Sequence, residues 1–372
     1  GALSLAIFIS TFATHPMSPR VRLKDVAEKA GVAVNTASTI LNRRPNSWAS
    51  KETEARVFAA AADLGYRPSK TARALRSGEF KAIGLLIQDL TNPFFSTLAD
   101  ELEAAAEARG YDLLIENARS SLVREKHLVA ELRDLEVDAT VLWLSDTEVF
   151  RPFLTQQFAQ HRPLLVLGNG VPAEPYPVDA ILSDFTHGLQ EAVDSLCAKG
   201  HRRFAFLNAL AEGQADGGRP RLFAEMLARR GIPLENIDFL RTGHTVEMAH
   251  ATFGRFIHEQ RHNLPTALVA MNDLAAIGAM RAAHEQGLSI PRDLSFIGVD
   301  DIPLASFLPV QLSSIRQRYR LIAAAAVEQI LLRINHSTIN PDAVPIAPQQ
   351  QVFPTQYRER ESVGPAPGHQ SA

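Results

Sequence analysis

The chain of 372 residues lacks several features that mark other classes of protein. Its single cysteine, Cys197, excludes an internal disulfide and is typical of a reducing compartment. No apolar run in the body of the chain reaches the length of a membrane span. Gly217-Gly218 is an isolated pair and not a glycine-rich loop that could hold a phosphate. We therefore expect a cytoplasmic protein that has no cofactor and no membrane segment.

The first residues are apolar but do not form a proper signal peptide. Gly1–Phe12 contains no Lys or Arg, its apolar run is short, and the first methionine is Met17. We interpret residues 1–16 as a cloning remnant or a start site placed too early. Residues 1–19 are accordingly expected to be a disordered leader.

One catalytic motif occurs by its letters alone. His258-Glu259-Gln260-Arg261-His262 matches H-E-x-x-H, in which two histidines on one helical face bind zinc and the glutamate is a base. The match lies at the polar end of a predicted surface helix, and no partner motif follows it. A solvated helix end explains these residues better than a metallopeptidase, so we expect no metal and no enzymatic activity.

The chain does contain a helix-turn-helix pattern in Arg22–Leu41. Apolar residues repeat at helical spacing from Leu23 to Ala30, and Gly31 can adopt the positive φ that a sharp turn requires. A second helix at about 34–41 places polar side chains on its outer face, where such a helix reads the major groove. A third helix at 51–64 begins after Ser50, a plausible N-cap. An ordinary helical hairpin is the alternative.

The charge distribution favours DNA binding. Residues 17–80 hold 12 lysines and arginines against 6 aspartates and glutamates, whereas the whole chain holds 38 against 41. A basic segment on an acidic body is typical of a protein that binds nucleic acid, because contacts to phosphates release counterions. We therefore predict a helix-turn-helix domain at 20–68 that binds double-stranded DNA.

The rest of the chain alternates apolar, strand-like runs with helical segments, from Ala82–Ile87 to a helix at 317–333. Repeated βα units predict parallel sheets with helices on both faces. About 280 residues of this pattern exceed one comfortable sheet, so we expect two lobes. Sheets of this kind bind ligands at the carboxyl ends of their strands, and two facing lobes form a cleft.

These features together resemble the lactose repressor and galactose repressor (LacI–GalR) family of bacterial transcriptional regulators. The motifs that carry the resemblance are Asp25-Val26-Ala27-x-x-Ala30-Gly31-Val32, Thr36-x-Ser38, Leu41-Asn42, Gly65-Tyr66-x-Pro68-Ser69-x-x-Ala72-Arg73-x-Leu75, Lys199-Gly200-His201-Arg202-Arg203, Ala270-x-Asn272-Asp273, Pro291-x-Asp293-x-Ser295, Gly298-Val299-Asp300-Asp301 and Leu312-Ser313-Ser314-Ile315-Arg316-Gln317. The resemblance covers roughly residues 20–360. It implies an all-α helix-turn-helix domain followed by a two-lobed α/β body like that of the periplasmic binding proteins.

The resemblance implies that two regions contact DNA. Base-reading residues of the second helix would be Val34, Asn35 and Thr39, with Thr36 and Ser38 as phosphate and orientation contacts. Residues 69–80 would be a hinge that folds on DNA, with Ala72 allowing close approach and Leu75 wedged into the minor groove. The expected partner is a near-palindromic operator, bound by a homodimer in the bacterial nucleoid.

The resemblance also implies an effector site in the body, residues 81–360. Phe94 would stack on the ligand, and Arg221, Asn272, Asp300 and Asp184 would bind its hydroxyl groups. Asp89 and His244 complete the predicted site. The effector would be a carbohydrate, and chain crossings between the lobes are expected near 200, 308 and 336, followed by a flexible tail at 361–372.

Two other classes of protein remain as alternatives. A solute-binding protein with the same body fold would explain the cleft, but it would not explain the basic three-helix head or the hinge. The metallopeptidase depends on the H-E-x-x-H match alone. The residues leave open whether the ligand would induce or co-repress transcription.

Overall fold

The computed structural model describes residues 21–41, 49–66, 79–131, 136–172, 174–208, 218–339 and 346–368. The chain divides into two compact units, residues 1–80 and 81–372. The predicted leader and the hinge residues Ala72 and Leu75 lie outside the described residues. Within the described part, no helix is long and apolar enough to cross a membrane.

The first unit contains the three predicted helices, α1 (Leu23–Ala30), α2 (Val34–Leu41) and α3 (Lys51–Asp63). Gly31 ends α1 at φ 65°, as the turn requires, and the Val32 N–H donates back to Ala27 O at 3.0 Å. Ser50 caps α3 by accepting a hydrogen bond from Thr53 N at 3.2 Å. The helices share a small core of eight buried residues: Val26, Ala27, Ala30, Ala37, Ile40, Val57, Ala60 and Ala61.

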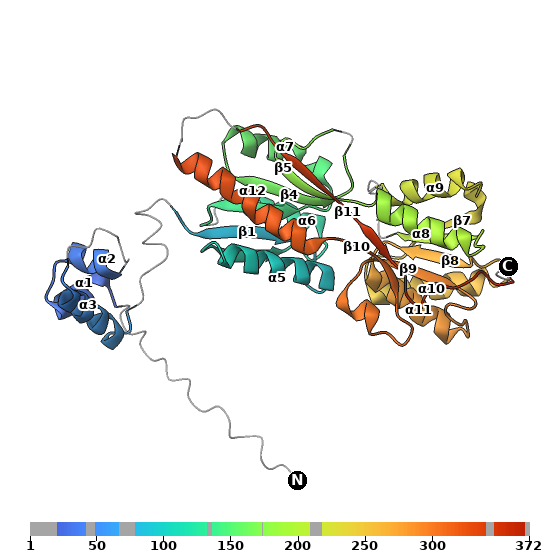
Figure 1. Ribbon diagram of the computed structural model, residues 1–372, viewed down its shortest axis with the longest axis horizontal. Coiled ribbons are helices and arrows are strands. Elements are labelled where there is room, and N and C mark those ends of the chain that lie inside the picture. Colours follow the sequence, from blue (N-terminus) through green and yellow to red (C-terminus); the bar gives the residue numbers. More distant parts are fainter. Residues whose placement is uncertain are drawn as a thin grey trace, which may run out of the picture. The chain divides into compact units, whose positions relative to one another are not determined.

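The second unit consists of two lobes, each built on a six-stranded sheet (Figure 1). The strands of the N-terminal lobe lie in the order β11-β5-β4-β3-β1-β2 and are all parallel. Its elements are β1 (Ala82–Ile87), α5 (Pro93–Glu107), β2 (Asp112–Asn117), α6 (Leu122–Glu131), β3 (Ala139–Trp143), α7 (Thr147–Ala159), β4 (Leu164–Asn169), β5 (Asp179–Asp184), α12 (Tyr319–Ile339) and β11 (Gln350–Pro354).

The C-terminal lobe has the strand order β12-β10-β9-β8-β6-β7, and only the pairing of β10 with β12 is antiparallel. Its elements are α8 (Thr186–Ala198), β6 (Phe204–Asn208), α9 (Arg219–Arg229), a 3-10 turn (Leu234–Asn236), β7 (Ile237–Arg241), α10 (Val246–Glu259), β8 (Ala267–Ala270), α11 (Asp273–Glu285), β9 (Ser295–Asp300), a 3-10 turn (Pro303–Ser306), β10 (Ser313–Arg316) and β12 (Gln356–Arg358).

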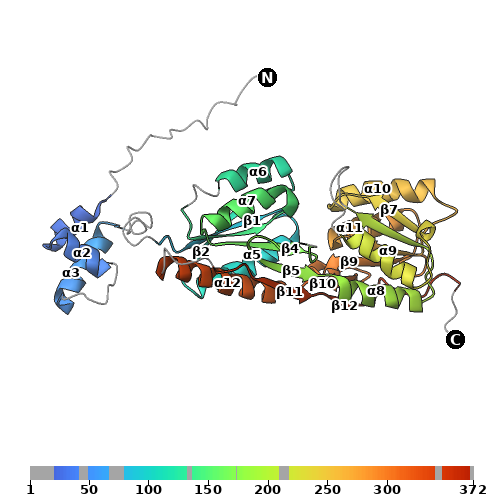
Figure 2. The same ribbon diagram turned by 90° about the horizontal axis from the view of Figure 1, so that it is seen from above.

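Helices cover both faces of each sheet (Figure 2). In the N-terminal lobe α5 and α12 lie on one face and α6 and α7 on the other; in the C-terminal lobe α10 and α11 lie opposite α8 and α9. The central strands are therefore buried on both sides, which explains why β1 reads as an unbroken apolar run, AIGLLI. The predicted fold class is confirmed.

The positions of the chain crossings differ from the prediction. The chain passes between the lobes after β5 at Phe185, between β10 and α12 at Gln317-Arg318, and between β11 and β12 at Thr355, instead of near 200, 308 and 336. Position 336 lies within α12, which continues unbroken to Ile339. The three observed crossings follow strands directly, so each is short.

The prediction of a flexible tail at 361–372 is also wrong for residues 361–368, which the structure describes. Ser362 is fully buried, its Oγ donates to Phe296 O at 2.6 Å, and its backbone oxygen accepts from Phe296 N at 2.8 Å. His201 Nε2 lies 3.0 Å from Gly364 O. Composition alone indicated flexibility, but these contacts fix residues 361–366 against the C-terminal lobe.

Candidate functional site

A cleft of about 400 Å³ lies between the two lobes, where the strands of both sheets end. Its wall in the N-terminal lobe follows β1, β2, β3 and β4, and its wall in the C-terminal lobe follows β6, β7, β8, β9 and β10. The lining residues are Gln88, Asp89, Asn92, Phe94, Phe95, Ser120, Trp143, Ser145, Asn169, Arg219, His244, Met248, Met271, Asn272, Asp300 and Gln317.

The structure brings five of the seven predicted effector residues together in this cleft. They are Asp89, Phe94, His244, Asn272 and Asp300. Arg221 and Asp184 lie outside it. The sequence analysis did not name Gln88, Trp143 and Ser145. Gln88 follows β1, Trp143 ends β3 and Ser145 follows it closely, so the rule that ligands bind at the carboxyl ends of parallel strands could have found them.

Arg219, and not Arg221, is the arginine of the cleft. The side chain of Arg221 is 77% exposed on the outside of α9 and pairs with Glu225 at 2.9 Å. Arg219 shares a helical face with the buried residues Phe223 and Met226, four and seven positions later, whereas Arg221 falls on the opposite face. The spacing to Phe223 is the signal that identifies the correct arginine.

Two contacts hold Arg219 in place. Its Nη1 donates to Met271 O at 2.8 Å, and its guanidinium carbon lies 4.8 Å from the centre of the Phe185 ring. Burial lowers the pKa of Arg219, and the nearby carboxylate of Asp300 opposes that effect. The cleft therefore contains a fixed cation beside an acidic side chain.

Asp184 acts at a chain crossing instead of in the cleft. Its Oδ1 accepts hydrogen bonds from Thr186 N at 2.9 Å and Thr186 Oγ1 at 2.7 Å, at the first residue of α8. Its backbone oxygen accepts from Thr355 N at 2.9 Å. Asp184 thus joins the first and third crossings between the lobes.

Asp300 ends β9 in a strained conformation, with φ at 103°. Its Oδ1 accepts a hydrogen bond from Gln317 Nε2 at 2.7 Å. Burial raises the pKa of Asp300 to about 7, although this hydrogen bond and the charge on Arg219 both lower it. Asp300 can therefore change its charge near neutral pH.

A second buried carboxyl group, Asp273, lies behind Asp300. It accepts hydrogen bonds from Ser314 Oγ at 2.6 Å and Ile302 N at 2.8 Å. Burial and the charge of Asp300 raise the pKa of Asp273 well above its usual range. Gly298 makes this arrangement possible, because a Cβ there would lie 2.0 Å from Asp273 Oδ1.

Asn272 is largely engaged by the protein itself. Its Oδ1 caps α11 by accepting from Ala275 N at 2.8 Å, and its Nδ2 donates to His244 O at 3.0 Å. The side chain that was predicted to bind ligand hydroxyl groups therefore also fixes the backbone of His244, another residue of the cleft.

Three aromatic rings form the apolar part of the cleft wall in the N-terminal lobe. The centre of the Phe94 ring lies 5.2 Å from the centre of the Phe95 ring and 5.2 Å from the centre of the Trp143 ring. Both pairs meet edge to face. Phe94 is only 4% exposed. Its position is therefore set by Phe95 and Trp143 before any ligand arrives.

The predicted DNA-reading residues divide into two groups on α2. Val34 is 43% exposed and Asn35 is exposed, while Thr36 and Thr39 are partly exposed. Thr39 Oγ1 donates to Asn35 O at 2.9 Å within the helix. Ser38 is only 9% exposed and faces the core, and this burial does not fit a phosphate contact.

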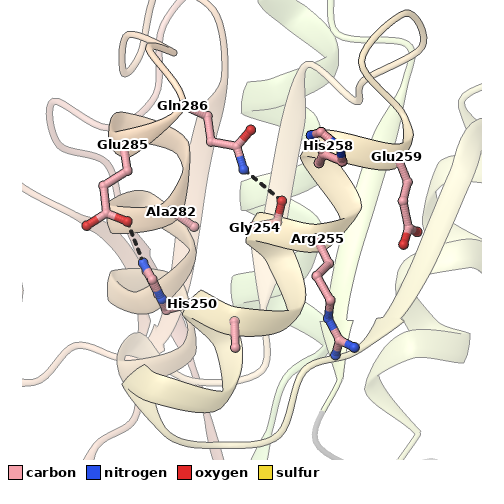
Figure 3. Close-up of a pocket in the computed structure, with 9 residues that line it drawn as sticks. His250, Gly254, Arg255, His258, Glu259, Ala282, Glu285 and Gln286 are labelled. Atoms are coloured by element: carbon pink, nitrogen blue, oxygen red, sulfur yellow. Dashed lines mark hydrogen bonds and ion pairs between the residues drawn. The ribbon is translucent and has the colours of Figure 1, made fainter.

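A second cavity, of about 370 Å³, lies between α10 and α11 and includes part of the H-E-x-x-H match (Figure 3). His250 Nε2 lies 2.7 Å from Glu285 Oε2, and Gln286 Nε2 donates to Gly254 O at 2.8 Å. Helix α10 ends at Glu259, so His262 does not continue the helical face of His258. No three His, Cys, Asp or Glu side chains in the described part of the chain gather as metal ligands.

Each of the two units contains a segment that matches a known protein family. Residues 22–69 match the family described as bacterial regulatory proteins, lacI family, and residues 193–363 match a periplasmic binding protein-like domain. A relative named HTH-type transcriptional repressor PurR from Edwardsiella ictaluri is 30% identical over 348 residues, which cover 93% of this chain and 97% of the relative. Its counterpart from Erwinia tasmaniensis is 28% identical over 347 residues, with the same coverage.

Solved structures of LacI-family regulators are also similar to this chain. The lac repressor dimer bound to operator and the anti-inducer ONPF is 26% identical, with a TM-score of 0.76 over 93% of this chain and all of the other. A LacI family transcriptional regulator from Enterococcus faecium with bound ribose is 26% identical, with a TM-score of 0.62 over 76% of this chain and 99% of the other. A LacI family regulator from Arthrobacter in complex with lactose is also 26% identical, with a TM-score of 0.61 over 76% of this chain and 98% of the other.

Proposed function

This chain belongs to the LacI family of DNA-binding repressors with an effector domain and is not an enzyme, and we propose that it is a cytoplasmic homodimer whose affinity for a near-palindromic operator is controlled by a small carbohydrate. The observation that carries this proposal is the cleft, in which a fixed arginine, a buried carboxyl group and three aromatic rings converge.

The DNA-binding part of the proposal rests on the exposed face of α2. Asn35 is exposed, and its amide can pair with an adenine edge, while Val34 can meet a thymine methyl group. A dimer presents two such helices, so two half-sites related by a two-fold axis are expected. Ala72 and Leu75, outside the described residues, would contribute the minor-groove contacts of the hinge.

The carbohydrate part rests on the chemistry of the cleft. Aromatic rings bind the apolar faces of sugars, and charged side chains bind hydroxyl groups through strong hydrogen bonds. Ribose and lactose occupy the related structures named above. The revised effector residues are Asp89, Phe94, Arg219, His244, Asn272 and Asp300.

Control of DNA binding would follow from closure of the cleft. Three short crossings connect the lobes, so the lobes can rotate about them when a ligand joins the two walls. In a dimer this rotation would change the distance between the two hinges and hence operator affinity. Such coupling is typically about 1–3 kcal/mol.

Two measurements test this function. A melting-temperature screen of the full chain against ribose, lactose, cellobiose and a panel of nucleosides should show stabilisation by at least one sugar, because a ligand that binds only the folded state raises its stability. Genomic fragments selected by the protein should then share a near-palindromic sequence, and the stabilising sugar should change their affinity in a gel shift. Equal affinity for selected and random duplex at physiological salt would overturn the proposal.

Substitution in the head separates this function from that of a solute-binding protein. Asn35→Ala should weaken binding to the selected sequence by about tenfold, from the loss of one bidentate base contact, and leave sugar binding unchanged. Leu75→Ala should likewise weaken operator binding and not sugar binding. If both variants bound the selected operator like the wild type, the DNA contacts would have to lie elsewhere.

A further inference from the structure

Glu125 is a buried carboxylate that lies behind the cleft wall and does not line it. It belongs to α6 and has 0% of its surface exposed. Its Oε1 accepts hydrogen bonds from Gln88 Nε2 at 2.9 Å and from Ser145 N at 2.8 Å. Its Oε2 accepts a hydrogen bond from Ser145 Oγ at 2.5 Å. Both donor residues line the cleft, so Glu125 contacts the ligand site only through them.

These hydrogen bonds decide which atoms Gln88 and Ser145 can offer to a ligand. Gln88 Nε2 also donates to Trp143 O at 2.8 Å, so both amide hydrogens are used inside the protein. The atom left for the cleft is its Oε1, an acceptor. The Ser145 hydroxyl has given its hydrogen to Glu125, so it too can only accept. An ionised carboxylate accepts hydrogen bonds and donates none, which fixes both orientations.

The neighbouring side chain in this wall has the same character. Asp89 follows Gln88 directly, and its Oδ1 already accepts hydrogen bonds from Thr91 N at 2.9 Å and Thr91 Oγ1 at 2.8 Å. Gln88, Asp89 and Ser145 therefore form a group of acceptors in the N-terminal wall. The cation of the cleft, Arg219, belongs to the opposite lobe.

We propose that Glu125 is a positioning residue that makes Gln88 and Ser145, beside Asp89, accept hydrogen bonds, and so selects effectors that present hydroxyl or amino groups to these three residues of the N-terminal lobe. An effector that presents a carboxylate or phosphate there is rejected, because acceptor would face acceptor. This inference rests on the proposed effector function of the cleft and specifies the chemistry of its ligand. Burial raises the pKa of Glu125, and the hydrogen bonds from Ser145 and Gln88 favour its ionised form.

Glu125→Gln tests the proposal with almost no change in shape. The new side-chain amide would donate to Ser145 Oγ, and the serine hydrogen would turn into the cleft as a donor. We expect the affinity for the sugar found in the melting screen to fall by about tenfold, as when one buried hydrogen bond is mismatched. Glu131→Gln is the matched control, because Glu131 is an exposed residue of the same helix, where it pairs with His127 at 3.3 Å. It should bind like the wild type.

The preference for a neutral over an anionic sugar distinguishes a positioning role of Glu125 from a merely structural one, because a structural defect would weaken the binding of both sugars equally. Each variant is titrated with a neutral sugar and its anionic counterpart: ribose with ribose 5-phosphate, and lactose with lactobionate. Wild type should prefer the neutral member, and Glu125→Gln should reduce that preference by tenfold or more. Operator affinity without ligand should stay the same. A uniform loss of affinity for both members of a pair, with the preference unchanged, would overturn the proposal.

An NMR measurement decides the hydrogen-bond network without any ligand. In protein labelled with ¹⁵N at glutamine side chains, the Gln88 amide, identified by its loss in Gln88→Leu, should exchange slowly with water and shift in Glu125→Gln. Fast exchange of this amide in the wild type would overturn the proposed network. If wild type bound no sugar while the Gln88 amide behaved as expected, the sugar-effector function would fail and the positioning of Gln88 by Glu125 would stand.

Discussion

The two walls of the cleft differ in where their buried carboxyl groups lie. The wall of the N-terminal lobe presents three aromatic rings and the side chain of Asp89, and its buried carboxylate, Glu125, lies one layer behind the surface. The wall of the C-terminal lobe places Arg219 and Asp300 in the cleft itself. The first wall therefore supplies shape and fixed hydrogen-bond direction, while the second supplies a charge that pH can alter. Changes in the second wall should have the larger effects.

The largest expected effect is that of Arg219→Ala. Removing a partly buried cation leaves Asp300 and the ligand without their charged partner, which should weaken effector binding by about a hundredfold. Calorimetry with the stabilising sugar measures this change, and the operator response to the sugar should disappear with it.

Arg221→Ala is the matched control, because it removes the same side chain two positions away on the exposed face of α9. It should cost less than about 0.5 kcal/mol of stability and leave binding unchanged. If Arg221→Ala abolished the response and Arg219→Ala did not, the effector would have to bind outside this cleft.

The second effect is a dependence of binding on pH. Because the pKa of Asp300 is raised to about 7, most of this carboxyl group is protonated at pH 6 and ionised at pH 8. A sugar whose hydroxyl donates to the carboxylate should bind about tenfold more tightly at pH 8 than at pH 6. Titration of wild type and Asp300→Asn at both values checks this, and the difference should vanish in the variant. His244→Gln should retain it, which separates Asp300 from the histidine of the cleft.

Stability should change with pH in the opposite direction. The pKa values of both Asp273 and Asp300 are raised on folding, so the folded state holds their protons more tightly than the unfolded state does. Their contribution to the free energy of unfolding is therefore full below the unfolded value near 4 and is lost as pH rises through the folded pKa of each group, which is about 7 for Asp300. Urea midpoints should fall between pH 5 and 8 while binding strengthens. If the urea midpoint and the binding affinity changed in the same direction with pH, a group other than these two carboxyl groups would control one of the two quantities.

The difference between the walls also shows which residues of the site can be predicted from the sequence. The family resemblance implied Asp89, Asn272 and Asp300, and the rule that polar residues after parallel strands meet at one edge supports all three, because it depends only on strand order. It could not separate Arg219 from Arg221, since both follow the same strand and only the rotation of α9 decides which points inward. It did not find Glu125 either, because that residue acts from a helix through the tertiary contacts of Gln88 and Ser145.

Local signals also explain the differences in the fold. The helices of the head were predicted because capping residues and a glycine turn mark their ends, as Ser50 and Gly31 do. The crossings near 308 and 336, which the family resemblance implied, could not be corrected from the sequence, because β10, β11 and β12 are short and join their sheets only through strands distant in sequence. The fixing of Ser362 depends on Phe296 and Gln311, which composition cannot reveal.

The smallest predicted effect concerns the aromatic wall. Phe94→Leu keeps an apolar side chain but removes the edge-to-face contacts with Phe95 and Trp143, which should lower the free energy of unfolding by about 1 kcal/mol and sugar affinity by about fivefold. Phe150→Leu is the control, because Phe150 is equally buried but packs in the separate core under α6 and α7. It should lose similar stability in urea and bind sugar normally. If the two variants lost equal affinity, the aromatic wall would act on the effector only through the stability of its lobe, and the contrast between the two walls would reduce to charge alone.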